Sequence, residues 1–90
     1  MKHAGRQALD QIDTILAALR LLEGLTEKSR GGFYHGRIAF LHFHEDPAGI
    51  FADLRTGADF ARFPVNTSSE ITTLLRRAKR ELVSRNSFQR

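Results

Sequence analysis

Apolar residues in the first 25 positions recur at intervals of three and four, which is the spacing of a helix with one buried face. Leu9, Ile12, Leu16 and Leu19 form the centre of this apolar stripe. Gly24 offers a stop signal, because glycine readily takes the backbone conformation that ends a helix. The pattern predicts a helix over residues 5–25, followed by the polar, glycine-ended connection LTEKSRGG.

The period changes to two in the middle of the chain, where short β-prone runs alternate with turn residues. His35-Gly36 separates the first two runs and suits a tight hairpin turn, since glycine supplies a positive φ. Pro47 and Gly49, within EDPAG, predict a second turn before the strand IFADLR. A weaker fourth strand, RFPV, follows the turn TGAD, and Pro64 confines that strand to an edge or an end.

The last element has the clearest start signal. The run TSSE matches a capping box, in which Thr67 and Glu70 each satisfy a backbone N–H group of the other. An apolar face then runs to about Val83 and includes Ile71, Leu74, Leu75, Ala78 and Leu82. Residues 84–90 show no periodicity, and we expect them to form a frayed basic tail.

The order of these elements predicts an α+β fold in a single domain over residues 1–90. An antiparallel sheet of three to four strands is flanked by an N-terminal and a C-terminal helix, in the order α-β-β-β-(β)-α. Ninety residues allow only a modest core, so stability is expected to be marginal.

The register of the central hairpin decides which side chains point to each face of the sheet, because a shift of one residue turns every side chain of a strand to the other face. A turn over residues 46–49 sets Leu41 opposite Leu54 and creates one wholly apolar face for both helices to cover. A five-residue loop would instead bury imidazoles beside aliphatic side chains, so burial favours the first register. The opposite face then carries a mixed set of side chains: Phe40, His42, His44, Phe51, Asp53 and Arg55.

This mixed face is too apolar to lie bare, because a large exposed apolar patch usually marks an interface. Ile38, Phe40 and Phe51 are its largest apolar residues in the predicted register. Two copies packing sheet to sheet or edge to edge would cover them. The sequence therefore predicts a homodimer with Ile38, Phe40 and Phe51 in its interface.

Composition and charge narrow the class of protein. The chain has no cysteine, which suits a reducing compartment, and no apolar run has the length of a signal peptide or of a membrane span. Residues 1–75 carry 8 Lys and Arg against 9 Asp and Glu, whereas residues 76–90 carry 6 against 1. The net charge of +4 therefore comes from the C-terminal segment. We expect a soluble, cytoplasmic protein with a nearly neutral body and no membrane partner.

The histidines of the central hairpin are the sharpest chemical signal. His42 and His44 project from one side of a strand at about 6.5–7 Å, a spacing at which two imidazoles can share a metal ion. Asp53 lies opposite His42 in the predicted register and supplies a third ligand, which predicts a divalent metal site at His42, His44 and Asp53. In the alternative interpretation, His42 and Asp53 form a cross-strand pair, and His44 lies at the solvent edge of the hairpin.

Other kinds of catalytic site find little support. The chain has no cysteine nucleophile, no serine with an evident base and orienting acid, and no glycine-rich phosphate loop. A dyad of His42 and Asp53 could serve acid–base chemistry. The sequence otherwise shows no recognisable catalytic machinery.

The basic run RRAKR is the candidate for nucleic-acid binding. Arg76, Arg77, Lys79 and Arg80 can neutralise phosphates, and the local excess of positive charge favours salt-sensitive binding. These four residues also lie outside the apolar stripe of the helix, so they equally suit the solvated face of an amphipathic helix.

The segment GFYHGRIAFLHFHEDPAGIFADLR resembles small bacterial proteins of unknown function that carry such a hairpin between two helices. It is also similar to the luciferase-like domain family, whose members have a histidine-rich strand followed by an acidic turn; His42 and His44 are the matching residues. The topology also resembles a double-wing, YjbR-like arrangement, for which DNA binding is sometimes suspected. The resemblance covers about residues 31–75, implies the hairpin fold and implies no luciferase chemistry.

These observations favour a homodimeric structural or binding module. The alternatives are a metal-binding protein that uses the His-x-His strand and a weak nucleic-acid binder that uses the last helix. A divalent metal is the only cofactor that the residues indicate, and no motif identifies a small-molecule ligand.

Overall fold

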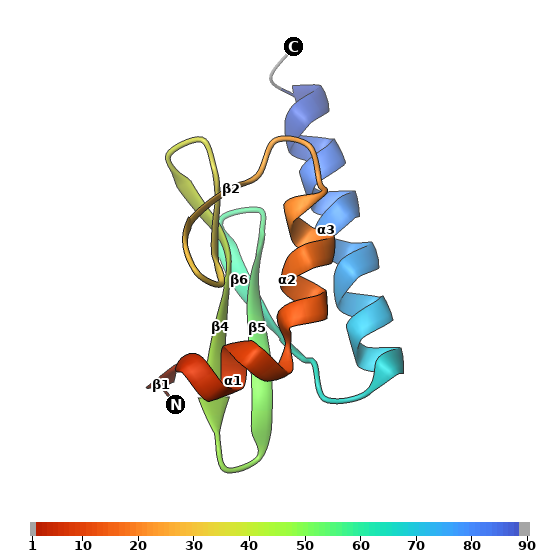
Figure 1. Ribbon diagram of the computed structural model, residues 1–90. Coiled ribbons are helices and arrows are strands. Elements are labelled where there is room, and N and C mark those ends of the chain that lie inside the picture. The colour runs from red at the N-terminus through yellow and green to blue at the C-terminus, as the bar shows by residue number, and fades with distance from the viewer. Residues whose placement is uncertain (1, 89–90) are drawn as a thin grey trace.

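The computed structural model describes residues 2–88 and has the α+β architecture of Figure 1. The elements in chain order are β1 (Lys2–His3), α1 (Arg6–Gln11), α2 (Asp13–Arg20), β2 (Thr26–Ser29), β3 (Gly32–His35), β4 (Ile38–Asp46), β5 (Gly49–Thr56), β6 (Asp59–Pro64) and α3 (Ser68–Phe88). The predicted fold class is confirmed. The predicted number of strands is wrong, because β1 and β2 join the sheet from segments that lack a period-two apolar pattern.

The sheet is antiparallel, with strand order β2-β3-β4-β5-β6, and β1 pairs with β4 outside this path. β3 pairs with the first half of β4, up to Leu41, whereas β1 pairs with His44 and Glu45 of the same strand. One edge of β4 is therefore divided between two partner strands, with a gap between them. β6 is an edge strand and ends at Pro64, as the sequence predicts.

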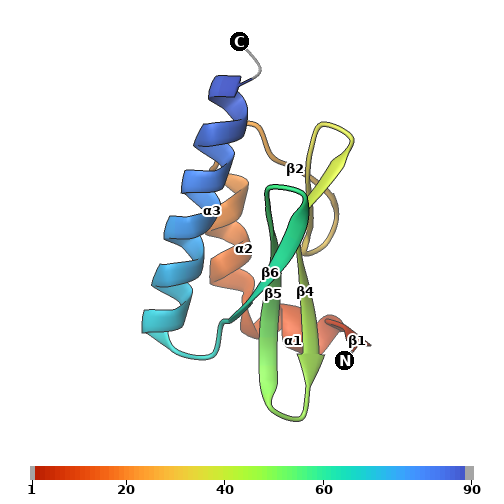
Figure 2. The same ribbon diagram turned by 180° about the vertical axis from the view of Figure 1, so that it is seen from behind.

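The helices cover one face of the sheet. Figures 1 and 2 show α2 and α3 side by side along the strands, with α1 crossing β4 and β5 near the N-terminus. The core between these layers includes fully buried leucines from every layer, namely Leu16, Leu19, Leu41, Leu54 and Leu74. No helix among residues 2–88 is long and apolar enough to cross a membrane.

The register of the central hairpin is confirmed. Leu41 pairs with Leu54, and Phe43 with Ala52, so the apolar face of the hairpin points toward the helices. Gly36 in the first turn has φ of 64°, which is the positive value that the turn requires.

The placement of Phe40 on the mixed face is wrong, because β4 contains a bulge there. Tyr34 pairs with Ala39 and Phe33 with Leu41, so Phe40 is the extra residue between these pairs. The bulge turns Phe40 into the core, where it is 0% exposed and lies under the Arg85 guanidinium. Ile38 is 45% exposed and Phe51 is partly exposed. Homodimerisation stays a prediction that rests on these two residues without Phe40.

The N-terminal helical segment is shorter and more divided than predicted. It breaks at Ile12, whose backbone leaves the helical conformation at φ −106° and ψ 19°, and it ends at Arg20 rather than near residue 25. Ile12 is buried, and no glycine or proline stands at the break. The change of direction lets α1 and α2 each bury an apolar face, so packing sets the break rather than local propensity.

The start of α3 follows the predicted capping box. The Glu70 N–H donates to Thr67 Oγ1 at 3.2 Å, and the Thr67 N–H donates to Glu70 Oε1 at 3.1 Å. The predicted end near Val83 is wrong, because the helix continues through Phe88. Arg85 donates to the carbonyl of Gly57, and Asn86 Oδ1 lies 3.0 Å from Nε2 of the buried His35. These contacts explain why residues 84–88 are helical without an apolar stripe; residues 89–90 lie outside the described residues.

Replacing the capping hydroxyl tests the start of α3. Thr67→Ala removes the acceptor of the Glu70 N–H, and we expect the free energy of unfolding to fall by about 1 kcal/mol. Urea denaturation measures this change. Thr73→Ala is the matched control, because Thr73 is exposed in the middle of the same helix and should change stability by less than about 0.5 kcal/mol. Equal losses in the two variants would contradict the capping role.

Candidate metal centre

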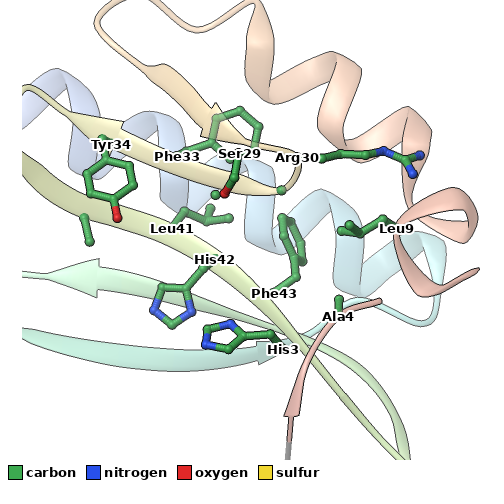
Figure 3. A pocket seen from close by; sticks show the side chains of 13 residues that line it. His3, Ala4, Leu9, Ser29, Arg30, Phe33, Tyr34, Leu41, His42 and Phe43 are labelled. Carbon is green, nitrogen blue, oxygen red and sulfur yellow. The ribbon is translucent and has the colours of Figure 1, made fainter. Parts of the chain in front are cut away.

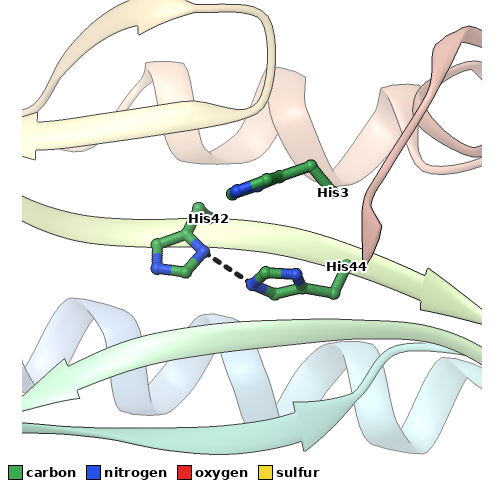
Figure 4. A group of neighbouring side chains, drawn as sticks. All are labelled: His3, His42 and His44. Atoms are coloured by element: carbon green, nitrogen blue, oxygen red, sulfur yellow. Dashed lines mark hydrogen bonds between the residues drawn. The ribbon is translucent and has the colours of Figure 1, made fainter. Parts of the chain in front are cut away.

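Three histidines from two strands converge on the face of the sheet opposite the helices. His42 and His44 project from β4, and the pairing of His3 with His44 brings a third imidazole from β1 to the same place. One ring nitrogen from each of the three lies within 4.8 Å of the others. Figure 4 shows the rings gathered around a common point. We call this group the histidine cluster.

The rings of the histidine cluster are in direct contact. Nδ1 of His42 lies 3.0 Å from Nε2 of His44, and the ring of His3 stacks on that of His44 at 4.8 Å between centroids. Phe60 on β6 packs its edge against His42 at 5.0 Å. His42 and His44 are half-buried and His3 is exposed, so the cluster has two fixed members and one at the surface.

Asp53 lies beside the cluster and is not one of its converging members. Its Oδ2 is 3.0 Å from Nε2 of His44, but Arg62 also donates to both carboxylate oxygens, at 2.8 and 2.9 Å. The backbone pairs His42 with Asp53, as predicted, whereas the side chain that contacts the carboxylate is His44. The expected cross-strand contact of His42 with Asp53, and the placement of His44 at the solvent edge, are therefore wrong. Side chains two residues apart on β4 lean along the strand, which Cα register does not predict.

The charges around the cluster favour a neutral His42. Burial, and then the neighbouring His44, lower the pKa of His42, because a second positive charge in this group would be poorly solvated. The hydrogen bonds from Arg62 lower the pKa of Asp53. Asp53 is 7% exposed, so its carboxylate depends on Arg62 for a counter-charge.

Sequence reasoning missed His3 because β1 is only two residues long. A strand of this length has no detectable period, and its partner lies about 40 positions away in the sequence. The one available signal was local charge, since Lys2 faces Glu45 in the ladder. That signal identifies a pairing only after the register of β4 is known.

A pocket of about 510 Å³ opens beside the cluster, in the gap between β1 and β3 (Figure 3). His3 and His42 lie on one side of it, with Tyr34 at one end. Its apolar lining includes Leu9, Leu41 and Phe43. Its volume is within the range of pockets that hold small molecules.

Ion pairs fix the turn between β2 and β3, which forms one wall of this pocket. Arg20 donates to both carboxylate oxygens of Glu27, at 2.5 and 3.1 Å, and the Gly31 N–H donates to the same carboxylate at 2.9 Å. Gly31 has φ of 82°, which strains any other residue, and a Cβ there would lie 2.7 Å from the end of the Leu9 side chain, so glycine is strongly favoured. The wall is thus tied to the helical layer.

The predicted nucleic-acid patch is only partly a free surface. Arg76, Lys79 and Arg80 are exposed on α3. Arg77 instead turns toward β6, where its guanidinium lies 5.6 Å from the ring of Phe63 and 3.5 Å from Glu81. Three exposed cations without an ion pair among residues 2–88 are also what a solvated helix face presents, so nucleic-acid binding stays a prediction.

Comparison of the chain with models of known protein families, with curated proteins and with solved structures finds no match. The resemblance of the hairpin to luciferase-like and double-wing proteins therefore stays a prediction. The assignment of function depends on the geometry of the site.

Removing the charge of Glu27 tests the wall of the pocket. Arg20 lowers the pKa of Glu27 below its ordinary value of 4.5, so this carboxylate stabilises the fold above that pH and ceases to do so as pH falls through its folded pKa. We expect Glu27→Gln to lower the melting temperature at pH 7 and the difference from wild type to close in acid. Thermal melts between pH 3 and 7 measure this. Glu23→Gln, at an exposed site on the same connection, is the control; a pH-independent gap for Glu27→Gln would contradict the role of its charge.

Proposed function

We propose that the protein is a small metal-binding module that holds a divalent transition metal, best Zn²⁺, between His3, His42 and His44. The observation that carries this proposal is the convergence of three imidazole nitrogens within 4.8 Å on two paired strands. Imidazole is the ligand that zinc shares with nickel and copper, whereas magnesium and calcium prefer oxygen. A cluster of three imidazoles therefore selects a transition metal.

The spacing of the nitrogens is close to that of a bound ion. Two ligands of a tetrahedral zinc ion, each about 2.0–2.1 Å from the metal, lie about 3.3 Å apart. The nitrogens of His42 and His44 are 3.0 Å apart, so they need to separate only slightly. His3 must approach the other two, and its exposed side chain on a two-residue strand is free to do so.

The protonation of the cluster suits metal binding but adds a cost at His44. The lowered pKa of His42 favours the neutral form, which is the form that ligates a metal. Nδ1 of His44 is buried and has no hydrogen-bond partner among the described residues, so its proton is best placed on Nε2, toward Asp53. Metal binding at Nε2 requires the other tautomer, in which the proton lies on the buried Nδ1 without an acceptor among the described residues. We therefore expect weaker binding than at a closed structural zinc site.

Asp53 and Arg62 would act as the outer partners of the ion. The carboxylate adds negative charge 3.0 Å from Nε2 of His44, and Arg62 holds its two oxygens in place. Because Asp53 contacts the ligating nitrogen itself, the carboxylate would act by adding negative charge beside the ion rather than through the imidazole ring. Three protein ligands leave a coordination position open, which is the arrangement of sites that bind or activate a further ligand.

Zinc should raise the melting temperature of the wild-type protein. A metal at 100 times its dissociation constant stabilises a fold by about 2.7 kcal/mol, equivalent to roughly 10–20 °C for a domain of this size. Differential scanning fluorimetry at pH 7.5, after treatment with a chelator and gel filtration, measures the shift. The shift should shrink as the solution is made acidic, because protons compete with the metal for the imidazoles.

Single substitutions assign the ligands. His3→Ala should abolish most of the zinc-dependent shift and leave the melting temperature of the metal-free protein nearly unchanged, since His3 is exposed. His35→Gln is the matched control: His35 lies outside the cluster, so this variant should be less stable but keep the full shift with zinc. No shift in wild type, or an undiminished shift in His3→Ala, would contradict a three-histidine site.

A further inference from the structure

We propose that the pocket beside the histidine cluster binds a small organic anion, with its acidic head group on the metal and an apolar body in the gap between β1 and β3. This inference rests on the proposed metal site. It adds the class of ligand that the open coordination position would take.

The pocket and the cluster share two side chains. His3 and His42 are members of the cluster and also line the pocket, so an ion held there would face the pocket directly (Figure 3). A ligand on the open position of that ion would extend along the edge of β4 between β1 and β3. Among the described residues, the unfilled stretch of this edge lies at His42, because β3 stops pairing at Leu41 and the Ala4 N–H already donates to the Phe43 carbonyl.

The lining of the pocket favours an apolar body. Leu9, Phe33, Leu41 and Phe43 are core residues whose side chains line the cavity, and Ala4 and Ala39 add small apolar surfaces. Arg30 is the only residue of the lining with a permanent charge. It forms ion pairs with Asp10 and Asp13 on the helices, at 2.8 and 3.4 Å. Figure 3 shows its guanidinium directed away from the cavity. The pocket therefore offers no free cation of its own to a charged ligand.

The charges around the proposed ion indicate that the head group of the ligand is anionic. Three neutral imidazoles leave a divalent ion with its full positive charge, and the nearest carboxylate, Asp53, is already paired with Arg62. An anionic oxygen donor, such as a carboxylate or a hydroxamate, satisfies the ion and places the remainder of the molecule among apolar side chains. Besides the histidines, Ser29 and Tyr34 are the uncharged polar side chains of the lining, so a uniformly polar ligand would leave most of its polar groups against apolar side chains, which is costly.

The rigidity of the wall favours a small molecule over a peptide strand. The β2–β3 turn is fixed by Arg20 and Glu27, and Gly31 is packed against Leu9. A peptide that paired with the free edge of β4 would need continuous access along that edge, and β1 and β3 occupy it on both sides.

The experiment uses three probes on the cobalt-loaded protein, because Co²⁺ occupies zinc sites and its visible spectrum reports a new ligand. Benzohydroxamate has a metal-binding head and an apolar body, acetohydroxamate has the head alone, and benzamide has the body with a much weaker head. We expect benzohydroxamate to bind at least about tenfold more tightly than acetohydroxamate, because its ring leaves water for the pocket. Benzamide should leave the spectrum unchanged.

Filling the pocket separates its contribution from that of the metal. Ala39→Leu, in the lining, should reduce the preference for benzohydroxamate to less than about threefold while acetohydroxamate binds as in wild type, which also reports an intact fold and metal site. Ala17→Leu, at an exposed position on α2, is the control and should keep the full preference. Cobalt binding with equal affinities for the two hydroxamates in wild type would overturn the pocket proposal and leave the metal site standing. Failure to bind cobalt or zinc would overturn the metal site and this proposal with it.

Discussion

The division of one edge of β4 between two partner strands is the constraint on which the site depends. β1 precedes α1 and α2 in the chain and β3 follows them, so the two strands meet the same edge from separate parts of the chain. A single continuous partner would have closed the ladder at His42 and left no gap there. The same arrangement delivers His3 to the two histidines of β4. The pocket and the histidine cluster therefore have one structural cause.

The second requirement is a counter-charge for Asp53. This carboxylate is buried on the sheet, and Arg62 on the neighbouring strand holds both of its oxygens. Because Arg62 already balances the charge, the histidines need not be protonated to stabilise Asp53, and His42 stays neutral. A purely structural explanation would account for His44, which also contacts Asp53. His3 reaches the same place through the pairing of β1 with β4 and stacks on His44 without contacting the carboxylate.

The sequence predicted those features that local patterns control. The alternation of apolar residues correctly gave the register of Leu41 with Leu54, and the capping box gave the start of α3. The bulge at Phe40 and the break at Ile12 could not be predicted, because no glycine or proline marks either position. Packing against the other layer produces both of them. Of the histidine cluster, the two members on β4 could be found from their spacing. His3 could not, since a two-residue strand has no period and its position depends on tertiary pairing.

Because β1 is weakly attached to the sheet, binding of the proposed ion would also affect how firmly this strand is held. The strand is held by a short ladder, by the bond of the Ala4 N–H to the Phe43 carbonyl at 3.1 Å, and by that of the Gly5 N–H to Glu45 at 2.6 Å. A segment with so few contacts opens at low free-energy cost. Part of the binding free energy of a metal would therefore be spent on ordering His3, and occupancy of the site would be coupled to the attachment of the N-terminal strand. Because β1 also bounds the pocket, closing that strand onto β4 would complete the wall against which a ligand of the ion lies.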